Sequence, residues 1–273
     1  MKVVILAGGI GSRLGDDTAE RPKPMVEIGG RPILWHIMKH LSHQGFNEFI
    51  IALGYRSEMI KRYFIDYAQV SRDMSINIPD SEIRYLYSNS EAWKVDLVDT
   101  GMTSNTAWRL KLLAEHLRDD RFLLTYGDGV SDVDVAKLLV EHRSAGAKAT
   151  YNKAGQCVSS SLATVTAVHP PARYGALRLA GSRVQEFAEK RSDEAWVNGG
   201  YIIFEPSIFH HQAMLEAKVD TDLSSGVLAR LAEKGQLSAY RHEGFWQGMD
   251  TARDKRILEE MWANGTAPWR VWE

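Results

Sequence analysis

The sequence lacks the features that mark several broad classes of protein. Its 273 residues include a single cysteine, Cys157, so no disulfide can form within the chain, and we expect a reducing, cytoplasmic location. No hydrophobic run approaches the length of a membrane-spanning helix, and the start, Met1-Lys2-Val3, is typical of a strand and not of a signal peptide. The net charge of -2 does not favour nucleic acid as a partner. Any anionic ligand must therefore be held by local charges.

A glycine-rich loop directly after the first apolar strand is the most informative segment. It reads Ala7-Gly8-Gly9-Ile10-Gly11-Ser12-Arg13-Leu14, and Lys23 follows in Pro22-Lys23-Pro24. Glycines let backbone N–H groups face an anion, and a guanidinium fork such as that of Arg13 matches phosphate oxygens. The loop matches neither a Walker A motif nor the Rossmann fingerprint. A plain tight turn is the alternative, but with the arginine and the lysine the pattern favours a nucleotide site.

The first half of the chain alternates between strand and helix. The patterns predict strands over residues 3–7, 48–53, 83–87 and 121–126, and helices over 32–44, 56–70 and 105–117. Such alternation is typical of an α/β fold with a doubly wound, mostly parallel, Rossmann-like sheet, which binds ligands at the carboxyl ends of its strands. We therefore expect the glycine loop and the segment Gly127-Asp128-Gly129 to lie at the same edge.

The second half is less regular. We expect strands over residues 163–168, 175–179 and 197–204, and helices over 207–216, 223–234 and 251–264. No linker rich in proline, glycine or serine separates the halves. The sequence therefore predicts one domain over residues 1–273, with a larger part over about 1–130 and a smaller lobe with the C-terminal helices over about 131–273.

Two aspartates are candidate ligands of a magnesium ion. Asp128 lies between glycines at a strand end, and Asp250 precedes a predicted helix. Mg²⁺ prefers carboxylate oxygens and commonly uses one or two of them together with substrate phosphates. Each aspartate alone has an ordinary alternative role, Asp128 in a turn and Asp250 as a helix N-cap. The metal hypothesis is stronger for the pair than for either residue.

Further polar residues are candidates for binding a second substrate. Lys190 follows Glu189 at the end of a predicted strand, where an exposed ion pair is the commoner outcome. Asn198 precedes two glycines inside an apolar run, and glycine in a strand often marks the close approach of a ligand. The segment Arg173-Tyr174-Gly175 is similarly open. We interpret Trp246 and Trp269 as packing residues.

At this point the chain resembles the sugar-1-phosphate nucleotidylyltransferases, and in particular their cytidylyl branch. The resemblance extends from Met1 to Glu273 apart from one segment. The motifs that support it are residues 5–14, 22–30, 32–38, 93–95, 97–101, 125–130, 198–200, 244–247, 249–251 and 267–269. The segment 97–101, Leu-Val-Asp-Thr-Gly, and the tryptophan-rich tail favour the cytidylyl branch over the others.

The resemblance implies transfer of a cytidylyl group from CTP to glucose 1-phosphate, with Mg²⁺ as cofactor, giving CDP-glucose and pyrophosphate. It implies a nucleotide-diphospho-sugar transferase fold in which the smaller lobe binds the sugar. It also implies site residues by role: Arg13 and Lys23 in catalysis; Leu6, Ala7, Gly8, Gly9, Gly11, Ser12, Arg13, Lys23, Thr106, Arg109 and Asp128 on the nucleotide; Tyr174, Gly175, Glu189, Lys190 and Asn198 on the sugar phosphate; Asp128 and Asp250 on the metal. We also expect a homo-oligomer.

Two alternatives to this activity stay open. One is the same chemistry with another nucleotide or sugar, such as dTTP or UTP. The other is a non-catalytic regulator that binds a nucleotide sugar, although it would not need to retain Lys23, Asp128, Asp250 and Lys190 together.

The sequence departs from the family pattern at two places. Ala107 and Trp108 stand where the family usually has two glycines before the arginine that matches Arg109. We expect Trp108 to pack under the helix and not to stack on the base. Residues 151–164 have no counterpart in the family pattern and read as a loop.

Overall fold

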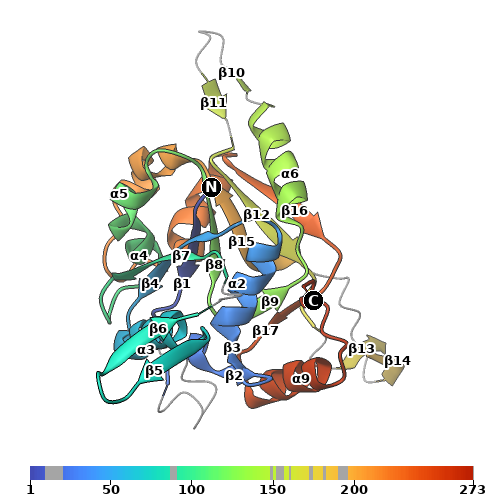
Figure 1. The fold of residues 1–273 in the computed structure, drawn as a ribbon. Coiled ribbons are helices and arrows are strands. Elements are labelled where there is room, and N and C mark those ends of the chain that lie inside the picture. Colours follow the sequence, from blue (N-terminus) through green and yellow to red (C-terminus); the bar gives the residue numbers. More distant parts are fainter. Residues whose placement is uncertain are drawn as a thin grey trace.

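The structure is a computed structural model. It describes residues 1–9, 21–86, 91–147, 150–151, 157–159, 161–171, 175–180, 183–189 and 196–272. Figure 1 shows a central sheet with helices on both sides and two hairpins, β10–β11 and β13–β14, that project from it.

The central sheet has seven strands in the order β16-β12-β15-β8-β1-β4-β7. Their bounds are Leu237–His242, Ala163–Val168, Val197–Phe204, Phe122–Tyr126, Val3–Leu6, Glu48–Leu53 and Lys94–Asp99. All neighbours pair in parallel except β15, which runs antiparallel to both β12 and β8. The predicted doubly wound, mostly parallel α/β sheet is confirmed.

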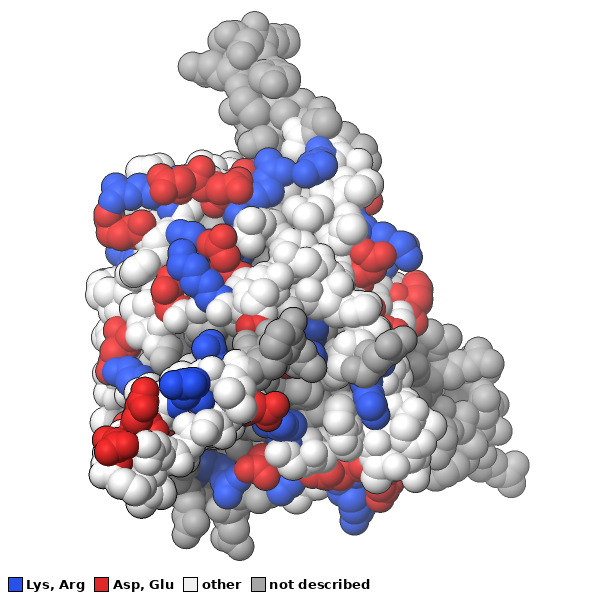
Figure 2. Space-filling model, viewed as in Figure 1, with Lys and Arg blue, Asp and Glu red and all other residues white. Residues whose placement is uncertain are grey.

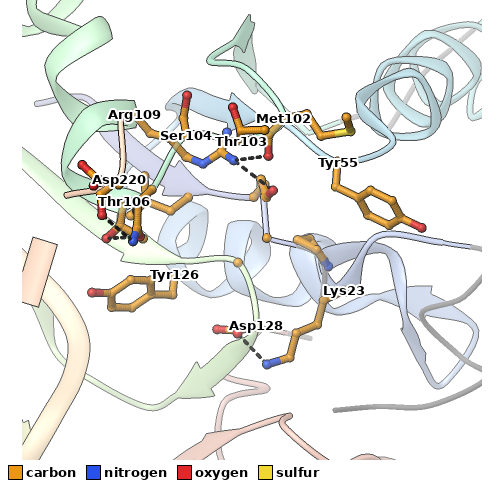
Figure 3. Close-up of a pocket in the computed structure, with 17 residues that line it drawn as sticks. Lys23, Tyr55, Met102, Thr103, Ser104, Thr106, Arg109, Tyr126, Asp128 and Asp220 are labelled. Atoms are coloured by element: carbon orange, nitrogen blue, oxygen red, sulfur yellow. Dashed lines mark hydrogen bonds and ion pairs between the residues drawn. The ribbon is translucent and has the colours of Figure 1, made fainter. Parts of the chain in front are cut away.

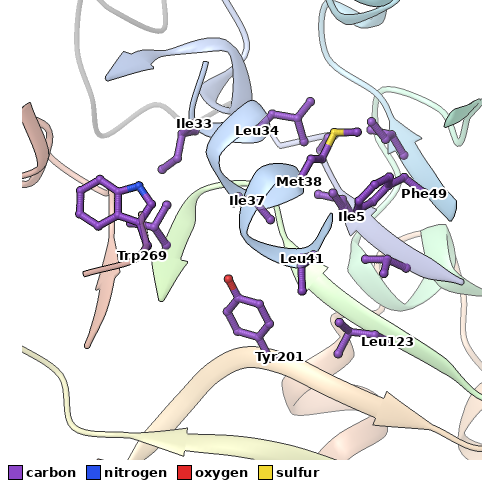
Figure 4. Packing of buried hydrophobic residues seen from close by; sticks show 14 of the residues in the cluster. Ile5, Ile33, Leu34, Ile37, Met38, Leu41, Phe49, Leu123, Tyr201 and Trp269 are labelled. Carbon is purple, nitrogen blue, oxygen red and sulfur yellow. The ribbon is translucent and has the colours of Figure 1, made fainter. Parts of the chain in front are cut away.

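Side chains alternate along β1 between two hydrophobic cores, as the period of a strand requires. Val3 and Ile5 belong to the core on one face, where α2 (Ile33–His43) packs, and Figure 4 shows Ile5 beside Met38 of that helix. Val4 and Leu6 belong to the core on the other face. That face is covered by α4 (Thr106–Leu112), α5 (Ala114–Leu117), η4 (Pro206–His210), α7 (Gln212–Leu215), η5 (Leu223–Leu228) and α8 (Ala229–Glu233). The strand β1 is thus buried on both sides.

The remaining described elements border this sheet. They are η2 (Lys23–Met25), β2 (Glu27–Ile28), β3 (Arg31–Pro32), α3 (Ser57–Val70), β5 (Met74–Asn77), β6 (Glu82–Tyr85), β9 (Gly129–Ser131), α6 (Val135–Ala147), β10 (Thr150–Tyr151), β11 (Cys157–Ser159), β13 (Gly175–Ala180), β14 (Arg183–Glu189), β17 (Trp246–Gly248) and α9 (Ala252–Ala263).

The strand predicted over 83–87 is confirmed as β6, but it does not join the central sheet. It pairs with β5 in a separate hairpin. The sheet is instead extended by β7, which pairs in parallel with β4. Strand β7 was not predicted, because polar and charged residues interrupt its apolar positions at this edge of the sheet.

Three predicted helices are interrupted. The helix predicted over 105–117 is divided at Leu113 into α4 and α5, and the one over 207–216 is divided into η4 and α7. The helix predicted over 223–234 begins as a π-helix, η5, before α8. The segment 151–164, which has no counterpart in the family pattern, was predicted as a loop. Its described residues 151 and 157–159 instead belong to the antiparallel pair β10 and β11, and residues 163–164 begin β12.

Candidate active site

A cavity of about 860 Å³ lies at the carboxyl edge of the central sheet, where β1, β4, β7 and β8 end. Every described residue that the resemblance assigned to the nucleotide lines it: Leu6, Ala7, Gly8, Gly9, Lys23, Thr106, Arg109 and Asp128. Figure 3 shows Arg109 on one side of this cavity, with Lys23 and Asp128 on the other. Residues from the ends of four strands are therefore gathered at one place, as expected for this class of sheet.

The ammonium group of Lys23 lies between the two predicted metal ligands. Its Nζ donates to Asp128 Oδ2 at 2.6 Å and to Asp250 Oδ1 at 2.8 Å. Burial of Lys23 lowers its pKa, but the attraction and hydrogen bonds of Asp128 and Asp250 outweigh this effect, and the pKa is raised above its ordinary value. The lysine is therefore charged at neutral pH, and the three residues form one charged cluster.

Short antiparallel pairing brings the two aspartates together. Strands β9 and β17 pair so that Gly129 lies opposite Gly248, and Met249 N donates to Asp128 O at 2.8 Å. Beyond this point, the N-cap of α9 is Thr251 and not Asp250, since the side chain of Thr251 accepts from Asp254 N and that of Asp254 accepts from Thr251 N. The capping box leaves the Asp250 carboxylate directed at Lys23.

The Pro-Lys-Pro segment positions Lys23 from the other side. It forms the short helix η2 with Pro22 as N-cap, which buries Lys23 to 9 % exposure. A Cβ atom on Gly127 would lie 3.1 Å from both Leu6 O and Pro24 Cγ. The glycine before Asp128 therefore lets the β8 turn approach both the end of β1 and η2.

Arg109 is buried, and its guanidinium ties together three strand ends. Nη1 donates to Leu53 O at 2.8 Å, to Thr100 Oγ1 at 2.7 Å and to Gly101 O at 2.8 Å. Nη2 donates to Gly8 O at 3.0 Å. Burial lowers the pKa of this arginine, and Asp99 acts in the opposite direction. Arg109, which was predicted to bind the nucleotide, thus lines the cavity, but most of its N–H groups hold the surrounding loops in place.

Two glycines make room for this guanidinium. A Cβ atom on Gly8 would lie 2.2 Å from Arg109 Cζ, and one on Gly54 would lie 2.5 Å from Arg109 Nη1. By contrast, a Cβ atom on Gly9 would meet no described residue within 4 Å. At Gly8 the absent side chain accommodates Arg109, whereas at Gly9 no described side chain requires the glycine.

Thr106 and Asn198 are also placed at the site. Thr106 lines the large cavity, but its hydroxyl donates to Asp222 Oδ2 at 2.9 Å and accepts from Leu223 N at 2.7 Å. Asn198 lines an adjoining cavity of about 70 Å³ together with Asp128 and Asp250. Because β15 runs antiparallel to its neighbours, residues near its start lie at the edge where β8 ends.

Comparison with known proteins shows the family of this chain. A model of that family, described as nucleotidyl transferase, matches residues 2–261. The chain belongs to the nucleotidyl transferase family. A glucose-1-phosphate cytidylyltransferase of Salmonella typhimurium is 44% identical over 278 residues, covering 100% of both chains. A protein of Bacillus subtilis described as a probable glucose-1-phosphate cytidylyltransferase is 36% identical, again over 100% of both chains.

Solved structures support the fold. The crystal structure of HddC from Yersinia pseudotuberculosis complexed with GMP-PN aligns with a TM-score of 0.67 at 22% identity, covering 96% of this chain and 99% of that one. A putative glucose-1-phosphate thymidylyltransferase from Bacillus anthracis gives a TM-score of 0.66 at 18% identity, covering 96% and 94% of the two chains. No helix among the described residues is both long and apolar enough to cross a membrane.

The donor set of this nucleotidyl transferase fits magnesium. Asp128 and Asp250 offer oxygen ligands on one side of the cavity, and among the described residues no group of three or more His, Cys, Asp or Glu side chains gathers as for a metal held by protein alone. Mg²⁺ commonly uses one or two carboxylates and leaves other positions to phosphates and water. The two carboxylates of this site therefore match the coordination that Mg²⁺ prefers.

Several predicted residues lie outside the described part of the chain. They are Gly11, Ser12, Arg13, Tyr174 and Lys190. Gly175 and Glu189 are described in their strands, and they lie directly opposite one another in the hairpin β13–β14. The structure therefore brings these two predicted sugar residues together.

Sequence reasoning missed part of the cavity wall. Tyr55 follows the end of β4, and Met102, Thr103 and Ser104 follow the end of β7. The rule that ligands meet the carboxyl ends of strands would have found the last three if β7 had been recognised. Trp246 was predicted to be a packing residue, but it lines the smaller cavity and donates from Nε1 to Gly199 O at 2.8 Å. Trp269 is fully buried, as predicted.

Trp108 does not line the large cavity, although its neighbours in α4 do. The side chain is half-buried, and the ammonium of Lys111 lies 5.0 Å from the centre of its ring. Ala107 is the residue of this pair that is fully buried. The helix therefore turns the indole away from the space where a nucleotide fits, although it does not bury it fully.

Proposed function

We propose that this chain transfers a cytidylyl group from CTP to glucose 1-phosphate and releases CDP-glucose and pyrophosphate. The observation that supports this most strongly is the 44% identity, over the full length of both chains, to the Salmonella typhimurium glucose-1-phosphate cytidylyltransferase. The cluster of Lys23, Asp128 and Asp250 supplies the charges that such a reaction needs.

The reaction requires two polyanions to meet. A phosphate oxygen of glucose 1-phosphate attacks the α-phosphorus of CTP, a new P–O bond forms, and the bond to the bridging oxygen of pyrophosphate breaks. The nucleophile is already anionic, so no base is required. Catalysis therefore consists mainly of positioning and of charge stabilisation.

We assign the nucleotide to the large cavity. The backbone of Gly8 and Gly9 would face its phosphates, with Arg13 beside them. Lys23 is charged, buried and directed into the cavity, so it is suited to stabilise the charge that develops on the α-phosphate and on the leaving pyrophosphate. Its ammonium has three N–H donors, so it can contact a phosphate oxygen while it keeps both carboxylate contacts.

Magnesium would be held by Asp128 and Asp250. When bound, Mg²⁺ neutralises phosphate charge and orients the reacting groups. In its absence the Lys23 ammonium balances the two carboxylates, which lie on separate segments of the chain. The aspartates thus remain paired with a cation before the substrates arrive.

We assign the sugar phosphate to the smaller cavity and the hairpin β13–β14. Asn198 lines that cavity beside the carboxylates, and Trp246 forms part of its wall. Tyr174, Gly175, Glu189 and Lys190 would complete the sugar site, with Lys190 on the phosphate. This division gives nucleotide binding to residues of about 1–130 and sugar binding to residues of about 131–273. We further infer a cytoplasmic homo-oligomer.

Product identification tests the proposal. The purified chain is mixed with CTP, glucose 1-phosphate and Mg²⁺, and the reaction is monitored by ³¹P NMR. Both substrates should be consumed, and CDP-glucose and pyrophosphate should form in equal amounts. A matched reaction without glucose 1-phosphate should release no pyrophosphate. If the complete mixture gives no CDP-glucose while the protein is folded, the proposed activity is wrong.

A further inference from the structure

The hairpin of β5 and β6 has two chemically different faces. Directly opposed residues of an antiparallel pair share a face. One face is apolar, with Met74 opposite Tyr85 and Ile76 opposite Ile83. The other face is polar, with Ser75 opposite Arg84 and Asn77 opposite Glu82. Such alternation is typical of a sheet that packs against something on one side only.

The apolar face is nevertheless open to solvent. Ile76, Ile83 and Tyr85 are 51%, 54% and 44% exposed, and none of them belongs to either hydrophobic core. Figure 2, in the same view as Figure 1, shows red and blue side chains close together among white ones at the corner occupied by this hairpin. An isolated two-stranded hairpin is only marginally stable in water. A surface of this kind favours association with another chain.

The outer edge of β6 pairs with no strand in the described part of the chain. Among the described residues, β6 pairs only with β5. In an antiparallel pair, every second residue directs its N–H and C=O groups at the partner strand. Leu86 N donates to Asp73 O at 2.7 Å, so residues 82, 84 and 86 are those that face β5. The peptide groups of Ile83 and Tyr85 therefore point outward. This edge can therefore accept a strand in only a few registers.

We propose that the occupant of this edge is β6 of a second copy of the chain, paired antiparallel about a two-fold axis at Ile83. Such an axis creates an interface in which each copy presents the same surface. Ile83 then lies opposite Ile83 of the second copy, which matches its outward-pointing peptide group. The result is a four-stranded antiparallel sheet with one continuous apolar face.

The charges of β6 select this register. With the axis at Ile83, Glu82 of each copy lies opposite Arg84 of the other, which gives two ion pairs on the polar face. The neighbouring register permitted by the backbone has its axis at Arg84 and places two guanidinium groups opposite each other. Like charges directly opposed across strands are destabilising. The sequence Glu82-Ile83-Arg84 is thus self-complementary in one register only.

Charge reversal tests the pairing. Glu82→Arg and Arg84→Glu each turn both ion pairs into repulsions, so each should weaken self-association at least about tenfold, measured by sedimentation velocity over a range of concentrations. An equimolar mixture of the two variants should associate again, because each strand then meets its opposite charge. The double variant Glu82→Arg/Arg84→Glu should also associate as the wild type does.

A charge reversal outside the hairpin serves as the control. Lys137→Glu reverses an exposed charge on α6 and should leave association unchanged. Both hairpin positions are exposed, and melting temperatures establish that the variants fold. A monomeric wild type, association that neither single variant weakens, or a mixture that fails to recover would each overturn the proposal. None of the hairpin residues lines the cavity, so the outcome is separate from that of the activity test.

Discussion

The Nζ atom of Lys23 lies 2.8 Å from Oδ1 of Asp250, a residue 227 positions further along the chain. The same Nζ atom lies 2.6 Å from Asp128. The contact unites the segment after β1, the turn after β8 and the start of α9. It shows that the charged centre of the site depends on the whole fold.

Asp128→Asn and Asp250→Asn should each lower kcat by at least about 10²-fold, because each removes one of two carboxylates that would hold the metal, and charge stabilisation of this kind is worth about 10²–10³ in rate. Steady-state assays at limiting Mg²⁺ measure the effect. Asp66→Asn, on the exposed side of α3, is the matched control and should keep full activity. Near wild-type turnover in either active-site variant would refute the paired metal site.

Lys23→Ala and Lys190→Ala should act on different kinetic parameters. Lys23 is aimed at the reacting phosphates, so its loss should lower kcat. Lys190, proposed to grip the sugar phosphate before and during the reaction, should chiefly raise the KM for glucose 1-phosphate. Initial rates with each substrate varied separately distinguish the two effects. Equal changes of both parameters in both variants would contradict this division of roles.

Arg109→Ala should destabilise the protein and weaken CTP binding together. The change removes the charged donor that reaches the carbonyls of Leu53, Gly101 and Gly8, and a hydrogen bond to a charged group contributes about 1.5–3 kcal/mol. Chemical unfolding and CTP titration measure the two losses. Gly54→Ala keeps the arginine but places a Cβ atom 2.5 Å from its Nη1, so it should change both quantities in the same direction. CTP affinity lost without any loss of stability would show that Arg109 acts on the ligand alone.

His36 should make stability depend on pH. It is fully buried, and burial lowers its pKa to about 4, while the backbone carbonyl of Ile28 acts in the opposite direction. The unfolded chain binds a proton near pH 6.5 and the folded chain does not, so stability is fully present above that value and is lost as pH falls toward 4. The loss is on the order of 3 kcal/mol.

Unfolding titrations from pH 7 to about 4 test this expectation. His36→Gln keeps a donor for Ile28 O but removes the titrating ring, so the slope of unfolding free energy against pH should fall. His43→Gln, on the exposed side of α2, controls for the loss of an imidazole and should keep the slope. An unchanged slope in His36→Gln would contradict the assignment.

The sequence predicts the parts of the site that follow buried strands. Gly8 and Asp128 lie within two residues of the ends of the buried strands β1 and β8, and parallel pairing of these strands places their ends together. Asp250 was predicted only as one of a pair, because its position depends on the pairing of β17 with β9 between distant segments. Its alternative role as an N-cap is excluded by the structure, in which Thr251 caps α9.

What could not be predicted depends on contacts between segments. Strand β7 lies at the edge of the sheet and is only half-buried, so its apolar pattern is weak, and the residues after it were missed. The positioning role of Arg109 was hidden because it requires Gly8 and Gly54 to lie against the same guanidinium. A buried polar residue whose hydrogen bonds go to backbone groups of distant segments has no recognisable pattern in a single sequence.

The comparison of nucleotides tests the central claim most directly. The measurement is kcat/KM for CTP, dTTP, UTP, ATP and GTP, each with saturating glucose 1-phosphate and Mg²⁺, followed by pyrophosphate release. Our account predicts that CTP is preferred by at least about tenfold, a difference of about 1.4 kcal/mol in transition-state binding, and that Asp128→Asn lowers turnover at least about 10²-fold with every nucleotide. Preference for another nucleotide, or near wild-type turnover in Asp128→Asn, would contradict it.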